Sequence, residues 1–417
     1  MNPLRLRWMV LALVFMASAI NYADRQIIAL LKPLIEQDLG WDDVTYGHLV
    51  TIFQFATACS LIAAGWFVDR VGIRRGYQVG VGAWSLAAMA HGLAHTFGQF
   101  GFVRAALGIA ETINSPAAVK TVATWFPAKQ RSLAMGIANA APNIGAIIVP
   151  LGVPLLVVAV GWRAAFVITG ALGFVWLAVW LVLGKRADAP PQPVQAVADD
   201  APPTPWLTLL KERRTWAIAG AKALSDLTWG FLLFWAPDFF ARQFGLDLDE
   251  RGKRLALVYG MAGLGALFGG AISNALLGRG VSVNRARKGV LLGAALIVTP
   301  IPLVVGVESS WMAALMLGAA LAAHQAFSTN VFAFTADIFP ARQIGSVIGI
   351  GATAGTLASI GILEFAGWTL KNGGGYEPMF ILCAVSYLLA VAWIHLMVPK
   401  IPQPAEDQVS APVVAGH

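Results

Sequence analysis

The sequence predicts an all-α membrane protein built from twelve transmembrane helices. Its 417 residues are 58% apolar and only 12% charged, and the mean hydropathy is +0.69. Because a soluble domain carries about 25% charged residues, this composition indicates an integral membrane protein. No ten-residue runs alternate between apolar and polar residues, as the strands of a membrane barrel do, so helices must satisfy the backbone.

Twelve apolar stretches are long enough to cross a bilayer, for which a helix needs about 20 residues. Six of them precede a polar segment near residue 200, and six follow it. The expected spans are 8–31, 45–67, 76–95, 97–122, 131–158, 162–184, 214–240, 253–277, 287–306, 310–336, 343–370 and 376–398.

Basic residues gather in alternate connections between the spans, and the opposite connections are acidic or mixed. This is the positive-inside pattern, and it predicts that both chain ends are cytoplasmic. The net charge of +7 therefore reflects membrane topology, and we expect no nucleic-acid partner. Representative basic residues are Arg5, Arg7, Arg70, Arg74, Arg75, Lys129, Arg131, Lys185, Arg186, Arg279, Arg285, Arg287 and Lys288, and the first opposite connection carries Glu36, Asp38, Asp42 and Asp43.

A polar linker divides the chain into two halves that repeat each other. Residues 187–205 hold six prolines among Ala, Gln and Asp, which is typical of an extended segment outside the membrane. The string Phe126–Gln130 recurs as Phe339–Gln343 at an offset of 213, after the fourth span of each half. Two parallel six-span halves with a site between them are typical of alternating-access transporters. We predict pseudo-symmetric six-helix bundles at 1–186 and 213–400, a cytoplasmic linker at 187–212 and a cytoplasmic tail at 401–417.

The connection between the second and third spans combines glycines with charges, in Gly65, Asp69, Arg70, Gly72, Arg74 and Arg75. Glycines allow two helices to meet across a tight turn, and arginines hold the loop on the cytoplasmic side. An aspartate at a helix end can pair with these arginines in one conformation and release them in another, which predicts a gating loop. The string resembles the signature loop of the major facilitator superfamily, a class of secondary transporters. The alternative is a charged turn that arose by chance.

Ionisable residues inside spans are costly, so each is a candidate for function. In the first span, Asp24 and Arg25 are neighbours whose side chains point about 100° apart. The alternative for both is contact with lipid headgroups. In the fourth span, Arg104 and Glu111 share a face but lie about 10 Å apart along the axis, so each needs a partner elsewhere or a ligand. A carboxyl among apolar residues binds protons readily, so Glu111 is the first candidate for proton binding, with a structural ion pair as the alternative.

The seventh and tenth spans each present a polar face. Lys222, Asp226 and Trp229 share a face of the seventh span, where a direct Lys222–Asp226 bridge is the structural alternative. A tryptophan offers a flat surface for a sugar ring, or an anchor at the membrane interface. Amide and hydroxyl groups in the tenth span suit a polyhydroxylated ligand, with helix packing as the alternative. The candidates there are His324, Gln325, Ser328 and Asn330.

Other patterns indicate no further chemistry. His91 and His95 are four residues apart, but no carboxylate or cysteine accompanies them, so we expect no metal. Cys59 and Cys383 are interpreted as small packing residues. The segment Ala17–Ala19 after an apolar run mimics a signal-peptide cleavage site, but cleavage there would leave an odd number of spans, so we expect a retained helix. No nucleotide loop, zinc spacing or nucleophile elbow occurs, and we do not expect an enzyme.

Beyond the signature loop, the chain resembles the anion:cation symporters of the superfamily, and among them bacterial hexuronate transporters. The resemblance runs from about residue 8 to 398 and rests on Ile20–Arg25, Lys120–Val122, Trp125–Pro127, Lys222 to Pro237, Val281–Lys288 and Ala323–Asn330. It implies proton-coupled uptake of glucuronate or galacturonate. It also implies that Arg25 holds the substrate carboxylate, that Asp24 and Glu111 carry protons, and that Arg104 tunes the acid of the fourth span.

These residues together define the expected site and setting. We expect protons as the coupling ion, no other cofactor, a sugar acid as ligand, and a monomer in a bacterial inner membrane. The absence of any Asn-x-Ser/Thr acceptor favours a bacterial source. A carrier of galactonate or glucarate is the nearest alternative, and a drug/proton antiporter is a further one that Arg25 argues against. The expected substrate contacts are Tyr22, Arg25, Lys222, Asp226, Trp229, His324, Gln325, Ser328 and Asn330.

Overall fold

The computed structural model describes residues 3–126, 128–184 and 206–401, and every regular element in these ranges is a helix. The predicted linker segment 187–205 and all but the first residue of the predicted tail lie outside the described residues. The elements are α1 (Pro3–Leu39), α2 (Asp43–Ala90), η1 (His91–Leu93), α3 (Phe97–Glu111), α4 (Asn114–Trp125), α5 (Ala128–Leu183), α6 (Trp206–Leu209), α7 (Arg213–Phe244), α8 (Leu248–Gly278), α9 (Val283–Val298), η3 (Ile301–Gly306), α10 (Ser310–Ile338), α11 (Ala341–Lys371) and α12 (Glu377–Met397).

The described helices account for twelve membrane crossings once two long helices are divided. By length and composition alone, eight of the described helices can cross a membrane, or nine if the bent α2 is included as one span. Both α2 and α5 contain a glycine with positive φ, Gly72 at 83° and Gly161 at 80°, where one span turns into the next. Glycine is favoured at such turns because other residues are strained there. The adjoining α3 and α4 together form one crossing. With α2 and α5 each divided into two, the described helices give twelve crossings, and the predicted all-α membrane fold is confirmed.

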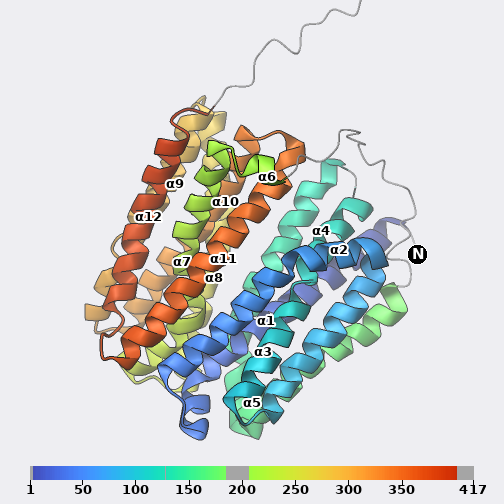
Figure 1. Cartoon of the computed structure of the whole chain (residues 1–417), viewed down its shortest axis with the longest axis vertical. Coiled ribbons are helices and arrows are strands. Elements are labelled where there is room, and N and C mark those ends of the chain that lie inside the picture. Colours follow the sequence, from blue (N-terminus) through green and yellow to red (C-terminus); the bar gives the residue numbers. More distant parts are fainter. Residues whose placement is uncertain (1–2, 127, 185–205, 402–417) are drawn as a thin grey trace, which may run out of the picture.

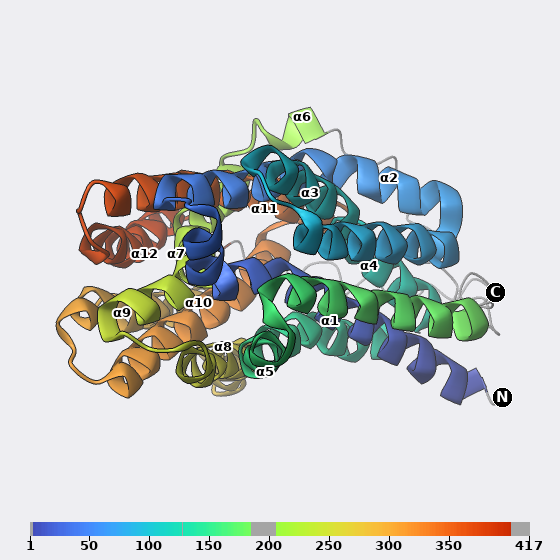
Figure 2. The ribbon, with the colours of Figure 1, turned by 90° about the horizontal axis from the view of Figure 1, so that it is seen from below.

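The two halves of the chain form two bundles that meet along three helix pairs. Figure 1 shows α1–α5 on one side and α7, α9, α10 and α12 on the other, and Figure 2 shows the same division from below. Across the boundary, α1 contacts α7, α2 contacts α11, and α5 contacts α8. The α2–α11 and α5–α8 pairs approach closely: a Cβ on Gly367 would lie 2.8 Å from the carbonyl oxygen of Asp43, and one on Gly252 would lie 1.9 Å from that of Pro150.

The internal sequence repeat corresponds to equivalent positions in the two bundles. Phe126 ends α4 with φ −114° and ψ 132°, and Phe339 ends α10 with φ −123° and ψ 145°. Both residues therefore leave a helix in the same extended conformation at the end of a fourth span. The repeated string marks the same turn in each half.

Close packing of small residues holds α8 against α10 inside the second bundle. A Cβ on Gly265 would lie 2.1 Å from the carbonyl oxygen of Ala322, and one on Gly269 would lie 2.4 Å from the Cα of Ala326. In membranes, such small residues let backbones approach and gain dispersion contacts. Gly65 differs: an added Cβ there would meet no atom within 4 Å, so the close helix contact expected at this glycine is wrong for this conformation.

We expect Gly265→Ala to lower the apparent melting temperature of the purified protein. The added methyl overlaps the α10 backbone, and overpacking of this kind costs about 1–3 kcal/mol. Gly289→Ala is the matched control, because no atom lies within 4 Å of its added Cβ and alanine favours the helix. Equal melting temperatures for the two variants would contradict the packing argument.

Candidate functional site

An ion pair between α1 and α3 lies near the middle of the first bundle. Nε and one terminal nitrogen of Arg25 each lie 3.1 Å from the same oxygen, Oε2 of Glu111. The Glu111 side chain is fully buried, whereas 19% of the Arg25 side chain is exposed. The amide of Asn21 also donates to the Glu111 carbonyl at 3.3 Å. The structure therefore brings the two charged residues together and leaves part of the guanidinium accessible.

Phe53 of α2 separates two guanidinium groups. The Arg25 guanidinium lies 5.1 Å from the centre of the Phe53 ring, and that of Arg104 lies 4.5 Å from it. Cation–π contacts of this kind contribute about 0.5–2 kcal/mol each. Arg104 is completely buried, and its three side-chain nitrogens have no hydrogen-bond partner among the described residues. As expected from their spacing, Arg104 and Glu111 do not bond to each other.

Two other residues of the first span differ in their surroundings. Asp24 is 2% exposed, and neither of its carboxyl oxygens has a hydrogen-bond partner among the described residues. Tyr22 lies under the Arg25 guanidinium, 4.9 Å from ring centre to Cζ, and its ring centre lies 6.4 Å from that of Trp229 on α7. Tyr22 thus contacts both the ion pair and the opposite bundle.

The second bundle supplies its own ion pair. Nζ of Lys222 lies 2.8 Å from Oδ1 of Asp226 and donates to the hydroxyl of Ser328 at 3.2 Å. The bridge within α7 that the spacing allowed is therefore present, and it is extended to α10. Gly355 of α11 leaves room beside it, because an added Cβ would lie only 2.1 Å from Oδ2 of Asp226.

An aromatic stack lies beside this second ion pair. The rings of Trp229 and His324 are parallel to within 15°, with centres 5.5 Å apart. The Nδ1 atom of His324 lies 2.6 Å from the hydroxyl of Tyr387 on α12, which in turn donates to the Ser225 carbonyl at 3.4 Å. The stack fixes the orientation of Trp229, the residue that faces Tyr22.

One pair of amide side chains joins the two bundles at the level of these ion pairs. Asn330, which the sequence predicts to contact substrate, lies elsewhere. The Gln325 amide donates to Oδ1 of Asn143 on α5 at 3.4 Å. Asn330 is fully buried, and its amide donates to the carbonyls of Gly269 and Ala326. Its donor is used here for packing α10 against α8, and the substrate contact at Asn330 stays a prediction.

Three residues at the centre, Phe53, Asn143 and Tyr387, are not among the candidates selected from the sequence. Phe53 is one of 22 phenylalanines, and an apolar ring inside an apolar span is ordinary. Asn143 and Tyr387 are polar residues of the fifth and twelfth spans, and each span holds other polar residues, such as Asn139 and Ser386. The rule that polar groups inside spans are candidates would have selected them, but only the fold shows that they reach this centre.

In the predicted gating loop, Asp69 contacts a lysine of the fourth span. Asp69 accepts from Lys120 at 3.0 Å, and Lys120 also donates to the carbonyl of Val68 at 3.1 Å. Arg70 lies over the ring of Trp66, 5.4 Å from its centre. Asp69 therefore pairs with the end of the fourth span here, and its exchange of partners with the loop arginines stays a prediction. Arg74 and Arg75 stay predictions as gating residues.

The histidines considered for a metal have separate surroundings. His91 is buried, is stacked on Phe166 with ring centres 5.2 Å apart, and has Nδ1 2.8 Å from the Ala87 carbonyl. His95 is exposed, and its backbone N–H donates to the side chain of Gln99. Each histidine is thus explained by local structure.

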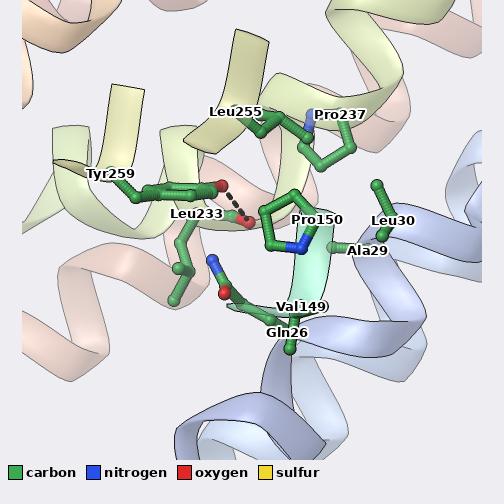
Figure 3. Close-up of a pocket in the computed structure, with 9 residues that line it drawn as sticks. All are labelled: Gln26, Ala29, Leu30, Val149, Pro150, Leu233, Pro237, Leu255 and Tyr259. Atoms are coloured by element: carbon green, nitrogen blue, oxygen red, sulfur yellow. Dashed lines mark hydrogen bonds between the residues drawn. The ribbon is translucent and has the colours of Figure 1, made fainter. Parts of the chain in front are cut away.

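A small pocket lies between the bundles, one helical turn from Arg25 toward the end where α1 stops and α2 begins. We call this the α1–α2 end. Figure 3 shows how α1, α5, α7 and α8 line the pocket, with Gln26, Pro150, Leu233 and Tyr259 converging. The Tyr259 hydroxyl donates to the Leu233 carbonyl at 3.4 Å, a group left without its helical donor because Pro237 has no N–H. The pocket volume of about 10 Å³ suits a single water and is too small for a metabolite.

Contacts between the bundles become denser toward the α1–α2 end. The Tyr46 hydroxyl donates to the Phe234 carbonyl at 2.8 Å, and Lys371 pairs with Asp42 at 2.8 Å. Hydrogen bonds from Lys371 and Thr45 hold the pKa of the Asp42 carboxyl below its usual range. The polar contacts that pair a described residue of one bundle with a described residue of the other lie at the centre or at this end. The centre is therefore sealed off at the α1–α2 end.

The arrangement can bind an anion between two paired charges, one from each bundle. Arg25 of the first bundle and Lys222 of the second each hold a carboxylate of the protein, and aromatic rings lie between them. A planar guanidinium binds a ligand carboxylate with two donors, so an incoming anion competes with Glu111 for Arg25. The site can thus exchange a protein carboxylate for a ligand carboxylate.

Comparison with known proteins places this geometry in a family. The sequence profile of the Major Facilitator Superfamily matches residues 14–363. The chain is 29% identical over 409 residues to the hexuronate transporter of Escherichia coli strain K12, covering 94% of each chain. It is 30% identical over 278 residues to the galacturonate transporter of Dickeya chrysanthemi, covering 64% of this chain and 81% of that protein. It is 25% identical over 423 residues to the D-galactonate transporter of Escherichia coli O6:H1, covering 95% and 96%.

A solved structure shares the fold. A bacterial homolog of the human lysosomal transporter Spinster, in an inward-facing and occupied conformation, superposes with a TM-score of 0.76. The similarity covers 94% of this chain and 96% of that one at 19% identity. At this identity the similarity shows the fold alone, and it agrees with twelve crossings in two bundles.

Proposed function

This chain belongs to the Major Facilitator Superfamily, and we propose that within it the chain is a proton-coupled symporter that imports a hexuronate, glucuronate or galacturonate. The observation that supports this proposal is the Arg25–Glu111 pair, in which a buried carboxylate holds a partly exposed guanidinium. A transporter for monovalent sugar acids needs a cation for the carboxylate and polar and aromatic groups for the sugar. Arg25 supplies the first, and Trp229, Gln325 and Ser328 supply the second.

Competition for Arg25 couples the proton to the substrate. When Glu111 takes a proton, its attraction to Arg25 weakens and the guanidinium is free for the substrate carboxylate. When substrate occupies Arg25, the buried Glu111 loses its cation and its protonated form is favoured. Binding linkage is reciprocal, so each ligand raises the affinity for the other. Once the charges of Glu111 and Arg25 are both neutralised, the electrostatic barrier falls for the change between the state open to one side of the membrane and the state open to the other.

Asp24 is the second proton carrier in this proposal. Its buried carboxyl oxygens have no hydrogen-bond partner among the described residues, and a proton removes the cost of burying the charge. One proton with one monovalent acid moves no net charge. A second proton makes uptake respond to voltage, by about 2.3 kcal/mol per charge per 100 mV.

The basic connections support an orientation with both termini in the cytoplasm of a bacterium, in the inner membrane. The α1–α2 end then faces outward, and the sealed contacts there correspond to an inward-facing state. We propose that the protein acts as a monomer, because each bundle contributes half of the central site within one chain.

The nearest competing substrates are open-chain sugar acids such as galactonate, since one relative of similar coverage is a galactonate transporter. Uptake of labelled glucuronate into proteoliposomes, with an imposed pH gradient and clamped voltage, separates the possibilities. Accumulation that collapses with the gradient and is competed by galacturonate supports the proposal. Accumulation of galactonate or glucarate alone would keep the coupling and replace the substrate, and no accumulation of any acid would overturn it.

We expect Arg25→Ala to lower the apparent affinity for the sugar acid at least about thirtyfold, because truncating one partner of a buried charge pair costs about 2–5 kcal/mol. Substrate binding to purified protein measures this directly. Arg25→Lys keeps the charge without the fork and should bind with intermediate affinity. Arg254→Ala is the matched control, since Arg254 is also buried and rests on Trp311 at the α1–α2 end. Wild-type affinity in Arg25→Ala would remove Arg25 from the site.

Phe53→Leu should lower the affinity about tenfold without abolishing transport, because it removes the ring that positions Arg25 and Arg104. Binding and uptake are measured together, so that a loss of protein is not mistaken for a loss of affinity. Phe55→Leu is the control on the same helix, since its side chain is 58% exposed. A similar loss in both variants would show that the ring acts through general packing.

Glu111→Gln should preserve substrate exchange across the membrane but prevent accumulation driven by a pH gradient. The amide keeps the size of the side chain and imitates the protonated acid, so Arg25 is free at every pH while no proton is carried. Counterflow and gradient-driven uptake, measured in the same proteoliposomes, separate the two activities. Glu250→Gln changes an exposed carboxyl at the α1–α2 end and should behave like wild type. Normal accumulation in Glu111→Gln would exclude this residue as the proton carrier.

A further inference from the structure

The two ion pairs of the central site differ in which charge is accessible. In the Arg25–Glu111 pair, 19% of the arginine side chain is exposed and 0% of the glutamate side chain. In the Lys222–Asp226 pair the order is reversed, with 9% of the lysine side chain and 16% of the aspartate side chain exposed. The first bundle therefore presents a cation to the centre, whereas the second bundle presents mainly a carboxylate.

The Asp226 carboxylate is held in one orientation by contacts on α7 and α11. Its Oδ1 lies 2.8 Å from Nζ of Lys222 and accepts from the hydroxyl of Ser225 at 3.3 Å. Its backbone carbonyl accepts from the hydroxyl of Ser359 on α11 at 2.8 Å. Oδ2 lies against Gly355, where an added Cβ would be only 2.1 Å away. Any residue larger than glycine at position 355 would therefore displace this carboxylate.

Lys222 is already neutralised by the protein. Besides its contact with Asp226, its ammonium donates to the hydroxyl of Ser328 at 3.2 Å and lies 5.3 Å from the ring centre of Phe332. Lys222 and Asp226 are four residues apart on one helix, so a movement of one bundle against the other leaves the pair intact. Lys222 therefore offers little positive charge to a second anion.

The two pairs lie on opposite sides of an aromatic contact between the bundles. Tyr22 of α1 faces Trp229 of α7, with ring centres 6.4 Å apart. Arg25 follows Tyr22 by three residues, and Asp226 precedes Trp229 by three. The two helices run in the same direction, as their contact nearer the α1–α2 end shows. With a rise of about 1.5 Å per residue, Arg25 and Asp226 are therefore about 9 Å apart along the helix axes.

A six-carbon sugar acid bridges this separation. Its carbon chain is about 6 Å long, and with a hydrogen bond of about 2.8 Å at each end it spans about 12 Å. An acid whose carboxylate binds Arg25 therefore brings its far end to Asp226. A hydroxyl there donates to the Asp226 carboxylate, whereas a second carboxylate has no proton to donate and carries the same charge. Like charges that meet in a poorly solvated site repel each other strongly.

We propose that Asp226 is a specificity-determining residue that restricts the carrier to sugar acids with one carboxylate, the uronates and aldonates, and excludes the dicarboxylic aldarates. Lys222 positions this carboxylate and offsets the cost of burying it. A group that repels the wrong ligand is a general source of specificity. The inference rests on the proposed function in one respect, that Arg25 binds the carboxylate of the acid. It does not depend on proton coupling or on which acid with one carboxylate is carried.

The test is competition binding to the purified full chain with two matched ligands. Galactonate and galactarate are open chains that differ only at one end, where galactonate has a hydroxyl and galactarate a second carboxylate. Each displaces labelled glucuronate at pH 7, where both carboxylates of galactarate are ionised. If glucuronate does not bind, labelled galactonate is the probe. In the parent protein we expect half-displacement to need a galactarate concentration at least about thirtyfold above that of galactonate.

Asp226→Asn should lower this concentration ratio to less than about threefold, because the repulsion is removed and Lys222 is freed for the second carboxylate. Lys222→Met combined with Asp226→Asn removes both charges and should give an intermediate ratio, since the repulsion is lost but no cation is gained. Asp249→Asn is the matched control. It removes the same charge from an exposed lysine–aspartate pair of the same spacing, with Lys253, and should leave the ratio unchanged.

Equal displacement by galactarate and galactonate in the parent would overturn the inference and leave the proposed function intact, as would a parental ratio in Asp226→Asn or an equal shift in Asp249→Asn. No binding of either labelled acid to the parent would overturn the proposed function and this inference together. If Asp226→Asn does not yield folded protein that binds the label, the double variant decides, because removing both members of a buried pair is tolerated better than removing one. A parental ratio in the double variant, or loss of the label from both variants, would overturn the role of Asp226 in selection.

Discussion

The cost of burying charge in a membrane protein is the constraint on which this structure depends. A charged side chain in a span needs a partner, and most of those in the described helices have one: Arg25 has Glu111, Lys222 has Asp226, and Lys32 has three carboxylates. Asp24 and the buried Arg104 are the exceptions at the centre, without a hydrogen-bond partner among the described residues. In the proposed function, a proton or an anion satisfies at these positions what the protein alone does not.

Charged groups and the small pocket lie in successive layers along α1 and α7, and the order of these layers determines how the centre communicates with the α1–α2 end. Counting toward the α1–α2 end, the paired charges of the centre come first, and the small pocket around Gln26 and Pro237 comes second. The third layer is the cluster in which the buried Lys32 pairs with Glu36, Asp43 and Asp238. The pocket is too small for a sugar acid, so the centre communicates with the α1–α2 end only if α1 and α7 separate. Glycine and proline make such movement possible at close crossings, as at Gly252 against the carbonyl of Pro150.

Much of the fold follows from the sequence, because hydropathy, positive charge and glycine act locally. The twelve spans, the turn at Gly72 and the equivalence of Phe126 and Phe339 are of this kind. Site contacts depend on which faces of distant helices meet, so sequence reasoning selected Glu111 and Arg25 as candidates but not Phe53 between the arginines. It assigned Asn330 to substrate because an amide inside a span has the same appearance whether it binds a ligand or the carbonyl of Gly269.

The two charged layers are mechanically connected because α1 carries both. Arg25 and Lys32 are seven residues apart, on one face of the helix and about 10 Å apart along its axis. A movement of α1 that carries Lys32 away from Asp238 must therefore also displace Arg25 relative to the second bundle, unless the helix bends between them. Pro33 permits bending there, since it leaves the Ala29 carbonyl without a helical donor. If a ligand binds at Arg25 as proposed, the stiffness of this one turn decides whether its binding also moves Lys32 relative to Asp238, because α1 carries both side chains.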